Sequence, residues 1–174
     1  MPGSVVGKTL NLGYPGNVSR SADAVIVNRP VRSTDSNPIP FGAPVVLNSD
    51  NTYSLFGATN TAADFAGVAI REVKQATSYL SQPYGQTQYN PGDPCDVIER
   101  GSVTVTCNVG TPVAGGPVYI RVAANASIPN GVVGGFEAAA DGTNTVQLTN
   151  VQWKTGKIDA NNTAEITILS RNKA

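Results

Sequence analysis

Short runs of alternating apolar and polar residues, separated by Gly-, Pro- and Asn-rich turns, constrain the fold of this chain most strongly. In the run 102–109, Val103, Val105 and Cys107 share one side of an extended chain, and Ser and Thr residues line the other. No stretch of twelve or more residues has the apolar period of an amphipathic helix. Short strands at intervals of about ten residues, with Gly and Pro turns between them, are typical of a β-sandwich or barrel.

We therefore predict an all-β fold: a compact single-domain barrel or sandwich of short, mostly antiparallel strands with long loops. Residues 1–22 are rich in Gly, Pro, Asn and Ser, so we expect them to form an extended N-terminal arm. Residues 23–174 carry the strand patterns and are expected to form a single β domain, with one strand at 24–28 and a longer one at 65–73. The run 117–124 repeats the alternation and is expected to turn Arg121 outward.

Composition excludes several classes of function. The 174 residues include no histidine, so neither a Ser-His-Asp triad nor a Cys-His pair is possible. Two cysteines alone cannot complete a tetrahedral thiolate site for a metal ion. Lys plus Arg equals Asp plus Glu at 12 each, and such a neutral chain does not attract nucleic acid or an anionic membrane. We predict no catalytic residue, no metal, no cofactor and no small-molecule substrate.

The N-terminus contains no apolar run of signal-peptide length. We therefore expect synthesis in a reducing cytoplasm, where the cysteines stay thiols.

The segment 159–165 imitates the start of a calcium-binding loop. Ala164 stands where such a loop needs glycine, and Ser170 stands where it needs a bidentate glutamate. We expect a polar turn there.

Tyrosines recur every five residues in the segment 74–94, at Tyr79, Tyr84 and Tyr89, among Gln, Pro and Gly. This spacing fits neither a helix nor a strand, and it predicts a long ordered loop. Long loops in compact domains are often functional. The tyrosine rings are therefore contact candidates, or alternatively they cap the core below.

The segment 90–109 holds both cysteines and reads as a hairpin whose loop is 100–102. This register places Cys95 opposite Cys107 on an apolar face, with Cα atoms about 4.5–5.5 Å apart. A separation beyond roughly 8 Å would reject the register.

Three carboxylates in the same segment, Asp93, Asp96 and Glu99, raise the hypothesis of a histidine-free hydrolase. Carboxylate catalysis requires two groups at a set separation across a cleft. Asp93 lies in a typical turn string, and in the predicted hairpin Asp96 faces the polar side and Glu99 borders the loop. A structural role is therefore favoured.

Four blocks of the chain resemble the structural cement, or capsid decoration, proteins of tailed bacteriophages, in the same order along the chain. They are FAGVAIREVK (65–74), YNPGDPCDVIERGSVTV (89–105), GGPVYIRV (115–122) and VQWKTGKIDANNTAEITIL (151–169). The resemblance implies a non-enzymatic virion protein, made in the host bacterial cytoplasm, that binds the outer surface of the phage head. It also implies a homotrimer that clamps neighbouring subunits of the major capsid protein.

The candidate contact residues lie in the arm and in the tyrosine-rich loop. They are Pro2, Val5, Val6, Leu10, Tyr14, Tyr79, Tyr84 and Tyr89. The alternative function is a carbohydrate- or receptor-binding β module of a phage tail or fibre, in which the loop tyrosines and Trp153 offer stacking surfaces.

Overall fold

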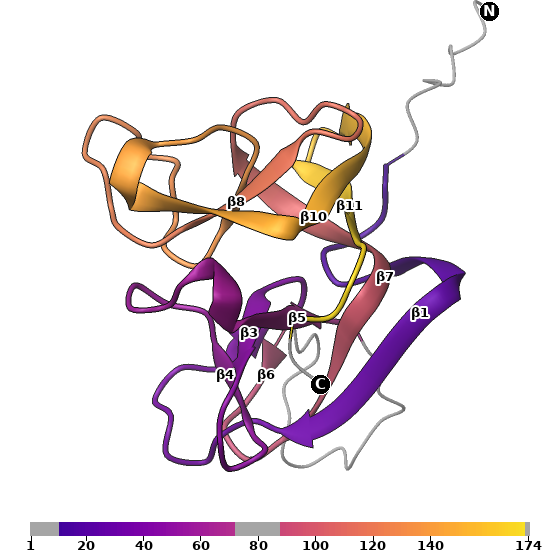
Figure 1. Cartoon of the computed structure of the whole chain (residues 1–174), viewed down its shortest axis with the longest axis vertical. Coiled ribbons are helices and arrows are strands. Elements are labelled where there is room, and N and C mark those ends of the chain that lie inside the picture. Colours follow the sequence, from indigo (N-terminus) through magenta and orange to yellow (C-terminus); the bar gives the residue numbers. More distant parts are fainter. Residues whose placement is uncertain (1–10, 72–87, 173–174) are drawn as a thin grey trace, which may run out of the picture.

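The long strand β7 (Pro94–Val109) joins the two halves of the molecule in the computed structural model (Figure 1). The structure describes residues 11–71 and 88–172. The other elements, in chain order, are β1 (Val18–Pro30), β2 (Ile39–Pro40), β3 (Pro44–Leu47), β4 (Tyr53–Leu55), the 3₁₀ turn η1 (Ala62–Asp64), β5 (Phe65–Ala69), β6 (Gln88–Tyr89), β8 (Pro117–Arg121), β9 (Phe136–Glu137), the 3₁₀ turn η2 (Gly142–Asn144), β10 (Thr145–Ile158) and β11 (Thr163–Ile168).

One half of the molecule is a closed circuit of strands. β7 pairs with β11, β11 with β10, β10 with β8, β8 with β9, and β9 returns to β7. Only the β7–β9 pair in this circuit is parallel. In the other half, the first part of β7 lies between β1 and β5, and the sheet continues through β3 to β4. The predicted all-β single domain is confirmed, with a barrel-like sheet.

The alternating runs fill the core as predicted. Val103, Val105, Cys107 and Val118 are at most 2% exposed, and Trp153 from β10 packs in the same cluster. Full burial of an aliphatic side chain contributes about 1.5–3 kcal/mol, so this cluster is a main source of stability. A second cluster lies in the other half and comprises Val31, Ile39, Phe41, Val45, Tyr53, Ala66, Ala69, Tyr89, Cys95 and Val97.

The predicted hairpin at 100–102 is wrong, because β7 continues through these residues as one strand. Gly101 does have a positive φ, +119°, but this conformation serves a close crossing of β1 over β7. A Cβ at Gly101 would lie 3.0 Å from the Cα of Ala24. Cys95 and Cys107 are both buried, as predicted, yet they belong to different core clusters and do not face each other. Pairing with β1 and β11, which are distant in the sequence, therefore keeps residues 100–102 in a continuous strand instead of a turn.

Two strand boundaries also differ from the prediction. β1 begins at Val18, within the range expected for the arm, and β5 ends at Ala69 rather than at residue 73. The first residues of β1 carry exposed polar side chains, so backbone pairing with β7 forms a strand that apolar alternation does not reveal. Within residues 11–71 and 88–172, no helix has the length and apolar character needed to cross a membrane.

Candidate contact surface

The segment 11–17 is tied to the barrel at several points before the chain enters β1. The amide of Leu12 donates to Oδ2 of Asp159 over 3.0 Å, in the turn between β10 and β11. The amide of Gly16 donates to the carbonyl of Thr104 over 2.7 Å, and the carbonyl of Gly16 accepts from the amide of Arg71 over 2.7 Å. The base of the N-terminal arm therefore has a fixed position on the barrel.

Asp159 is the acceptor at the outer end of this attachment. Burial raises the pKa of its carboxyl, but hydrogen bonds from the backbone amides of Thr163, Leu12 and Asn161 outweigh that effect, and the pKa lies below its ordinary value of 3.8. The polar turn predicted at 159–165 is present at 159–162, whereas residues 163–165 already belong to β11. The carboxylate of Asp159 binds amides of the chain itself.

Tyr14 is presented to solvent from this attached segment. Its side chain is 64% exposed, and the guanidinium carbon of Arg71 lies 4.8 Å from the centre of its ring. The hydroxyl of Thr104 donates to the carbonyl of Tyr14 over 2.6 Å, which fixes the backbone below the ring. An exposed aromatic ring on a fixed backbone can contact a partner with little loss of entropy.

The other predicted contact residues are placed differently. Pro2, Val5, Val6, Leu10, Tyr79 and Tyr84 lie outside the described residues. Tyr89 has no exposed surface: its hydroxyl donates to the carbonyl of Ile70 over 2.8 Å, and its ring packs edge-on against Phe41. Trp153 is 1% exposed. The expectation that Tyr89 and Trp153 offer stacking surfaces for a sugar is therefore wrong.

The long loop after β8 is built around Arg121, which the alternation expected to face outward. That expectation is wrong, because Arg121 is fully buried. Its guanidinium donates twice to the buried carboxylate of Glu137, through Nε over 2.5 Å and through Nη2 over 2.9 Å. Nη1 donates to Asp141 over 2.7 Å and to the carbonyl of Ala123 over 3.1 Å. The paired charges allow a cation to lie inside the fold.

The same arginine shapes the tip of this loop. The amide of Gly134 donates to the carbonyl of Arg121 over 2.8 Å, and a Cβ at Gly131 would lie 2.3 Å from Nε of Arg121. Between these two glycines, Val132 and Val133 are 56% and 40% exposed. The buried ion pairs therefore hold two apolar side chains at the surface. The Val-Val pair between Asn-Gly and Gly-Gly is the sequence signal that could have located this tip.

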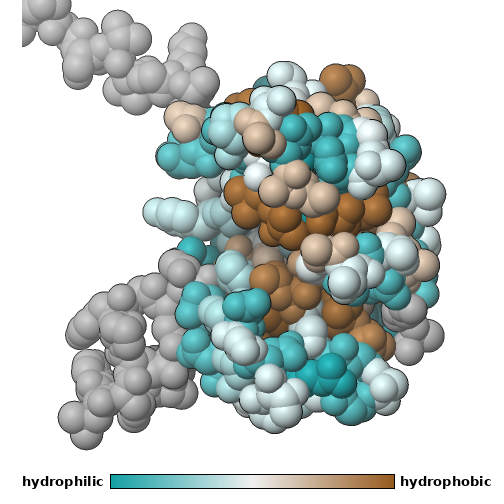
Figure 2. All heavy atoms as spheres, turned by 90° about the vertical axis from the view of Figure 1, so that its left-hand side faces the viewer, coloured by the Kyte–Doolittle hydropathy of each residue, from teal (hydrophilic) through white to brown (hydrophobic). Residues whose placement is uncertain are grey.

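Apolar residues gather across the middle of one face of the molecule, between more polar ends (Figure 2). The loops after β4 and β8 meet in the fold, since a Cβ at Gly134 would lie 2.7 Å from the carbonyl oxygen of Phe56. The large apolar side chains with substantial exposure among the described residues are Tyr14, Ile26, Val113, Val132, Val133, Ile158 and Leu169. They offer apolar contact area on a chain with few charges.

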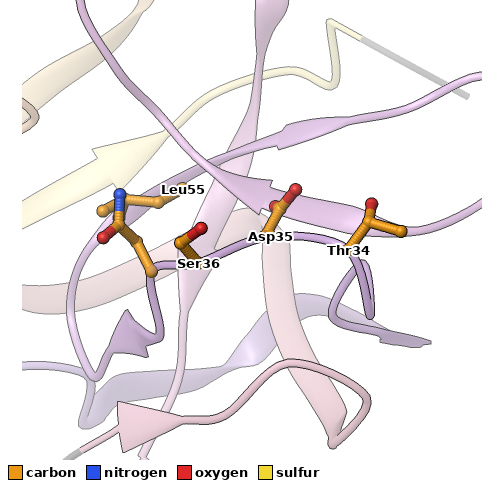
Figure 3. Close-up of a pocket in the computed structure, with 5 residues that line it drawn as sticks. Thr34, Asp35, Ser36 and Leu55 are labelled. Atoms are coloured by element: carbon orange, nitrogen blue, oxygen red, sulfur yellow. The ribbon is translucent and has the colours of Figure 1, made fainter.

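An open hollow of about 320 Å³ lies beside the turn that precedes β2 (Figure 3). It is lined by Thr34, Asp35, Ser36, Asn37 and Leu55. Asp35 is the one ionisable residue in this lining. No group of three or more metal-ligating Cys, Asp or Glu side chains occurs within residues 11–71 and 88–172.

The carboxylates of β7 serve structure. Glu99 is 1% exposed and accepts from Arg29 over 2.8 Å and from the hydroxyl of Tyr53 over 3.0 Å. Nη2 of Arg171 lies 2.5 Å from its other oxygen. Burial, and then the charge of Glu99, raise the pKa of Tyr53, so its phenol stays a donor. Asp96 instead accepts from Asn28 of β1. Glu99 was expected at the edge of a loop, and it is in fact the centre of a clamp between β1, β4, β7 and the C-terminal segment.

Comparison with known proteins identifies the class. The family model of the XM1 gp53 minor capsid protein matches residues 3–168. The chain therefore belongs to this family of phage capsid proteins, which confirms the resemblance to a phage capsid-associated family and gives the chain a structural role in the virion.

A solved structure supports the same fold. The chain is similar to a chain in the capsid of Myoviridae phage XM1, with a TM-score of 0.69 and 18% sequence identity, over 95% of this chain and 96% of that one. No curated protein matches the chain.

Proposed function

We propose that the protein is a non-enzymatic capsid decoration protein. It binds the outer surface of an assembled phage head and stabilises the shell by clamping neighbouring subunits of the major capsid protein. The observation that carries the proposal is membership of a minor capsid family across residues 3–168. The charge-poor composition and the apolar side chains held at the surface support binding to protein.

The clamp uses the N-terminal arm together with the braced loops. The described chain begins beside Asp159, where the amide of Leu12 is held. An extended segment of ten residues reaches at most about 33–36 Å, which is enough to cross a boundary between capsid subunits. The arm contributes Val5, Val6 and Leu10 as apolar contacts on the neighbouring subunit, and Tyr14 adds an aromatic contact at its base.

A homotrimer multiplies these contacts. A threefold oligomer over a local threefold position of the shell makes equivalent contacts with each surrounding subunit. Linked weak contacts can exceed the affinity of one contact by about 10²–10⁴. A ligand that binds only the assembled, mature lattice stabilises that lattice by mass action.

The test mixes the purified protein with undecorated heads of its phage. We expect saturable co-sedimentation with the heads and an increase in the temperature at which they release DNA. A chain lacking residues 1–10 should keep its own melting temperature and bind the heads more weakly. Absence of binding to heads would contradict the proposal. Unchanged affinity of the shortened chain would contradict the role of the arm alone.

Trp153 and Tyr89 do not support the alternative of a carbohydrate- or receptor-binding module, because both side chains are buried in the core.

A further inference from the structure

Strand β1 has one edge with which no other strand of the described residues pairs. It pairs with β7 along one side, and no other strand of the described chain pairs with it, as its position at the margin of the molecule in Figure 1 illustrates. None of its thirteen residues is buried. Yet Val25, Ile26 and Val27 are consecutive β-branched residues, and Ile26 is 45% exposed. Natural proteins usually protect an apolar edge strand, because a strand of another chain can pair with its free edge.

The exposed edge has a regular and an irregular part. From Ile26 to Pro30 the residues pair one by one with Ile98 to Pro94 of β7. Between Val25 and Ile26 the register shifts, because β7 has one extra residue there, Glu99. A further shift lies between Arg20 and Val25, where Asp23 and Ala24 cross over Gly101. Pro30 lacks an amide and ends the edge that a partner could use. The regular part of the edge is therefore short, and Ile26 lies at its start.

We propose that β1 is a self-association surface: it pairs antiparallel with β1 of a second copy about a twofold axis at Ile26. The local sequence is self-complementary about this residue. In that register Ile26 lies opposite Ile26 of the second copy, and Val25 lies opposite its Val27. Cross-strand pairs of β-branched residues contribute roughly 0.2–1 kcal/mol each, so the sheet of one copy continues into the other.

Charge favours the same register. Asp23, whose carboxylate is 69% exposed, lies three residues before the axis, and Arg29 lies three residues after it. Arg29 shares the buried carboxylate of Glu99 with Arg171, so this cluster of two cations and one anion keeps one net positive charge. The exposed pair between Asp23 and Arg100, at 2.9 Å, is of the kind that contributes little to stability. Asp23 of one copy therefore meets positive charge on the other.

This contact goes beyond the proposed decoration of the head. A threefold contact builds the trimer, whereas a twofold β1 joint links one trimer to the next. A ladder this short is marginal by itself, and it becomes occupied where the shell holds the copies at high local concentration.

Disulfide trapping tests the joint without capsids. In Ile26→Cys, the two new thiols face each other at a Cα separation of about 4.5–5.5 Å, within the range that a disulfide bridges. The native cysteines are buried and do not compete. With an added thiol oxidant, at high protein concentration, we expect covalent dimers of Ile26→Cys to accumulate at least tenfold faster than those of Val113→Cys. Val113 is 66% exposed and lies in the loop between β7 and β8, so it reports random collision.

A second variant tests the register. Asn28 lies on the same strand, is also exposed, and is two residues from the axis. Its two copies are then four residues apart along the ladder, about 13 Å, and Asn28→Cys should cross-link no faster than Val113→Cys. Equal rates for Ile26→Cys and Val113→Cys would overturn the self-association, and faster trapping through Asn28→Cys would overturn the register. Binding to heads is measured separately, so failure of this joint and failure of the decoration function give different results.

Discussion

Removal of the buried guanidinium of Arg121 should be among the most damaging single changes in this fold. Arg121→Met keeps much of the aliphatic volume and deletes the charge. It removes four hydrogen bonds, two to Glu137, one to Asp141 and one to the carbonyl of Ala123. It leaves the carboxylate of Glu137, which has no exposed surface, without its cation.

The expected magnitude follows from this burial. Breaking a buried ion pair by removing one partner costs about 3–5 kcal/mol, because the remaining charge is uncompensated. A domain of this size loses about 2–4 °C of melting temperature per kcal/mol, so the melting temperature should fall by about 6–20 °C. Replacing both partners, in Arg121→Met with Glu137→Met, should recover part of this loss, since no unpaired charge then remains at Glu137.

The assay is thermal unfolding at pH 7, followed by circular dichroism. Arg32→Met is the matched control, because Arg32 pairs with Asp50 at the surface, with 39% and 48% of the side chains exposed. We expect the control to melt close to the unmodified protein. If Arg121→Met melts within about 2 °C of the control, an effect below about 1 kcal/mol, the loop is not held by this network. Should Arg121→Met fail to fold, the double variant still provides the comparison.

Three further predictions concern the thiols, the arm and a crossing of strands. Burial raises the pKa of Cys107 to about 11. Its thiol should therefore resist iodoacetamide at pH 8 in the native protein and react fully in urea, and labelling of the native protein would contradict this. The pKa of Asp159 in the folded protein lies below its ordinary value of 3.8. The attachment of the arm is therefore complete above pH 3.8 and is lost as the pH falls through the lowered pKa. Asp159→Ala should make the amide of Leu12 exchange hydrogen several-fold faster at neutral pH, and unchanged exchange would refute the attachment. Gly101→Ala should lower the free energy of unfolding, measured in urea, by more than about 1 kcal/mol, because φ is +119° and the new Cβ would lie 3.0 Å from the Cα of Ala24 in β1. Gly57→Ala should be close to neutral, because the atom nearest to its new Cβ, Oδ1 of Asn60, is 3.9 Å away.

Local patterns in the sequence predicted the barrel core well. Val103, Val105 and Val118 alternate with polar residues, and their burial follows from the pleat of a strand. The Asn-rich turns between strands also follow the pattern, since Asn51, between β3 and β4, has the positive φ of a turn residue. These features depend on residues close together in the chain, which the sequence displays directly.

The errors all come from partners distant in the sequence. Arg100, Gly101 and Ser102 have turn chemistry, but pairing with β1 and β11 on either side keeps β7 extended through them. Alternation assigned Arg121 to the solvent, whereas Glu137 of β9 and Asp141, which follows this strand, neutralise it. No local signal announces a counter-ion sixteen residues further along the chain.

The exposure of the candidate contact residues could be predicted from the sequence only in part. Tyr14 is exposed as an arm residue should be, and its ring stacks on Arg71, a partner that only the fold supplies. The apolar tip at Val132 and Val133 lies in a loop without strand alternation, so it was missed. Exposure of an apolar pair depends on how the loop is braced, and that bracing is a tertiary property.

Decoration of the head is the central claim, and a cryo-electron microscopy map of heads incubated with the protein tests it most directly. We predict added density on the outer surface of the shell, three copies around each occupied local threefold position, each bridging neighbouring major capsid subunits. A map without added density, or with density confined to the inner surface, would contradict the account.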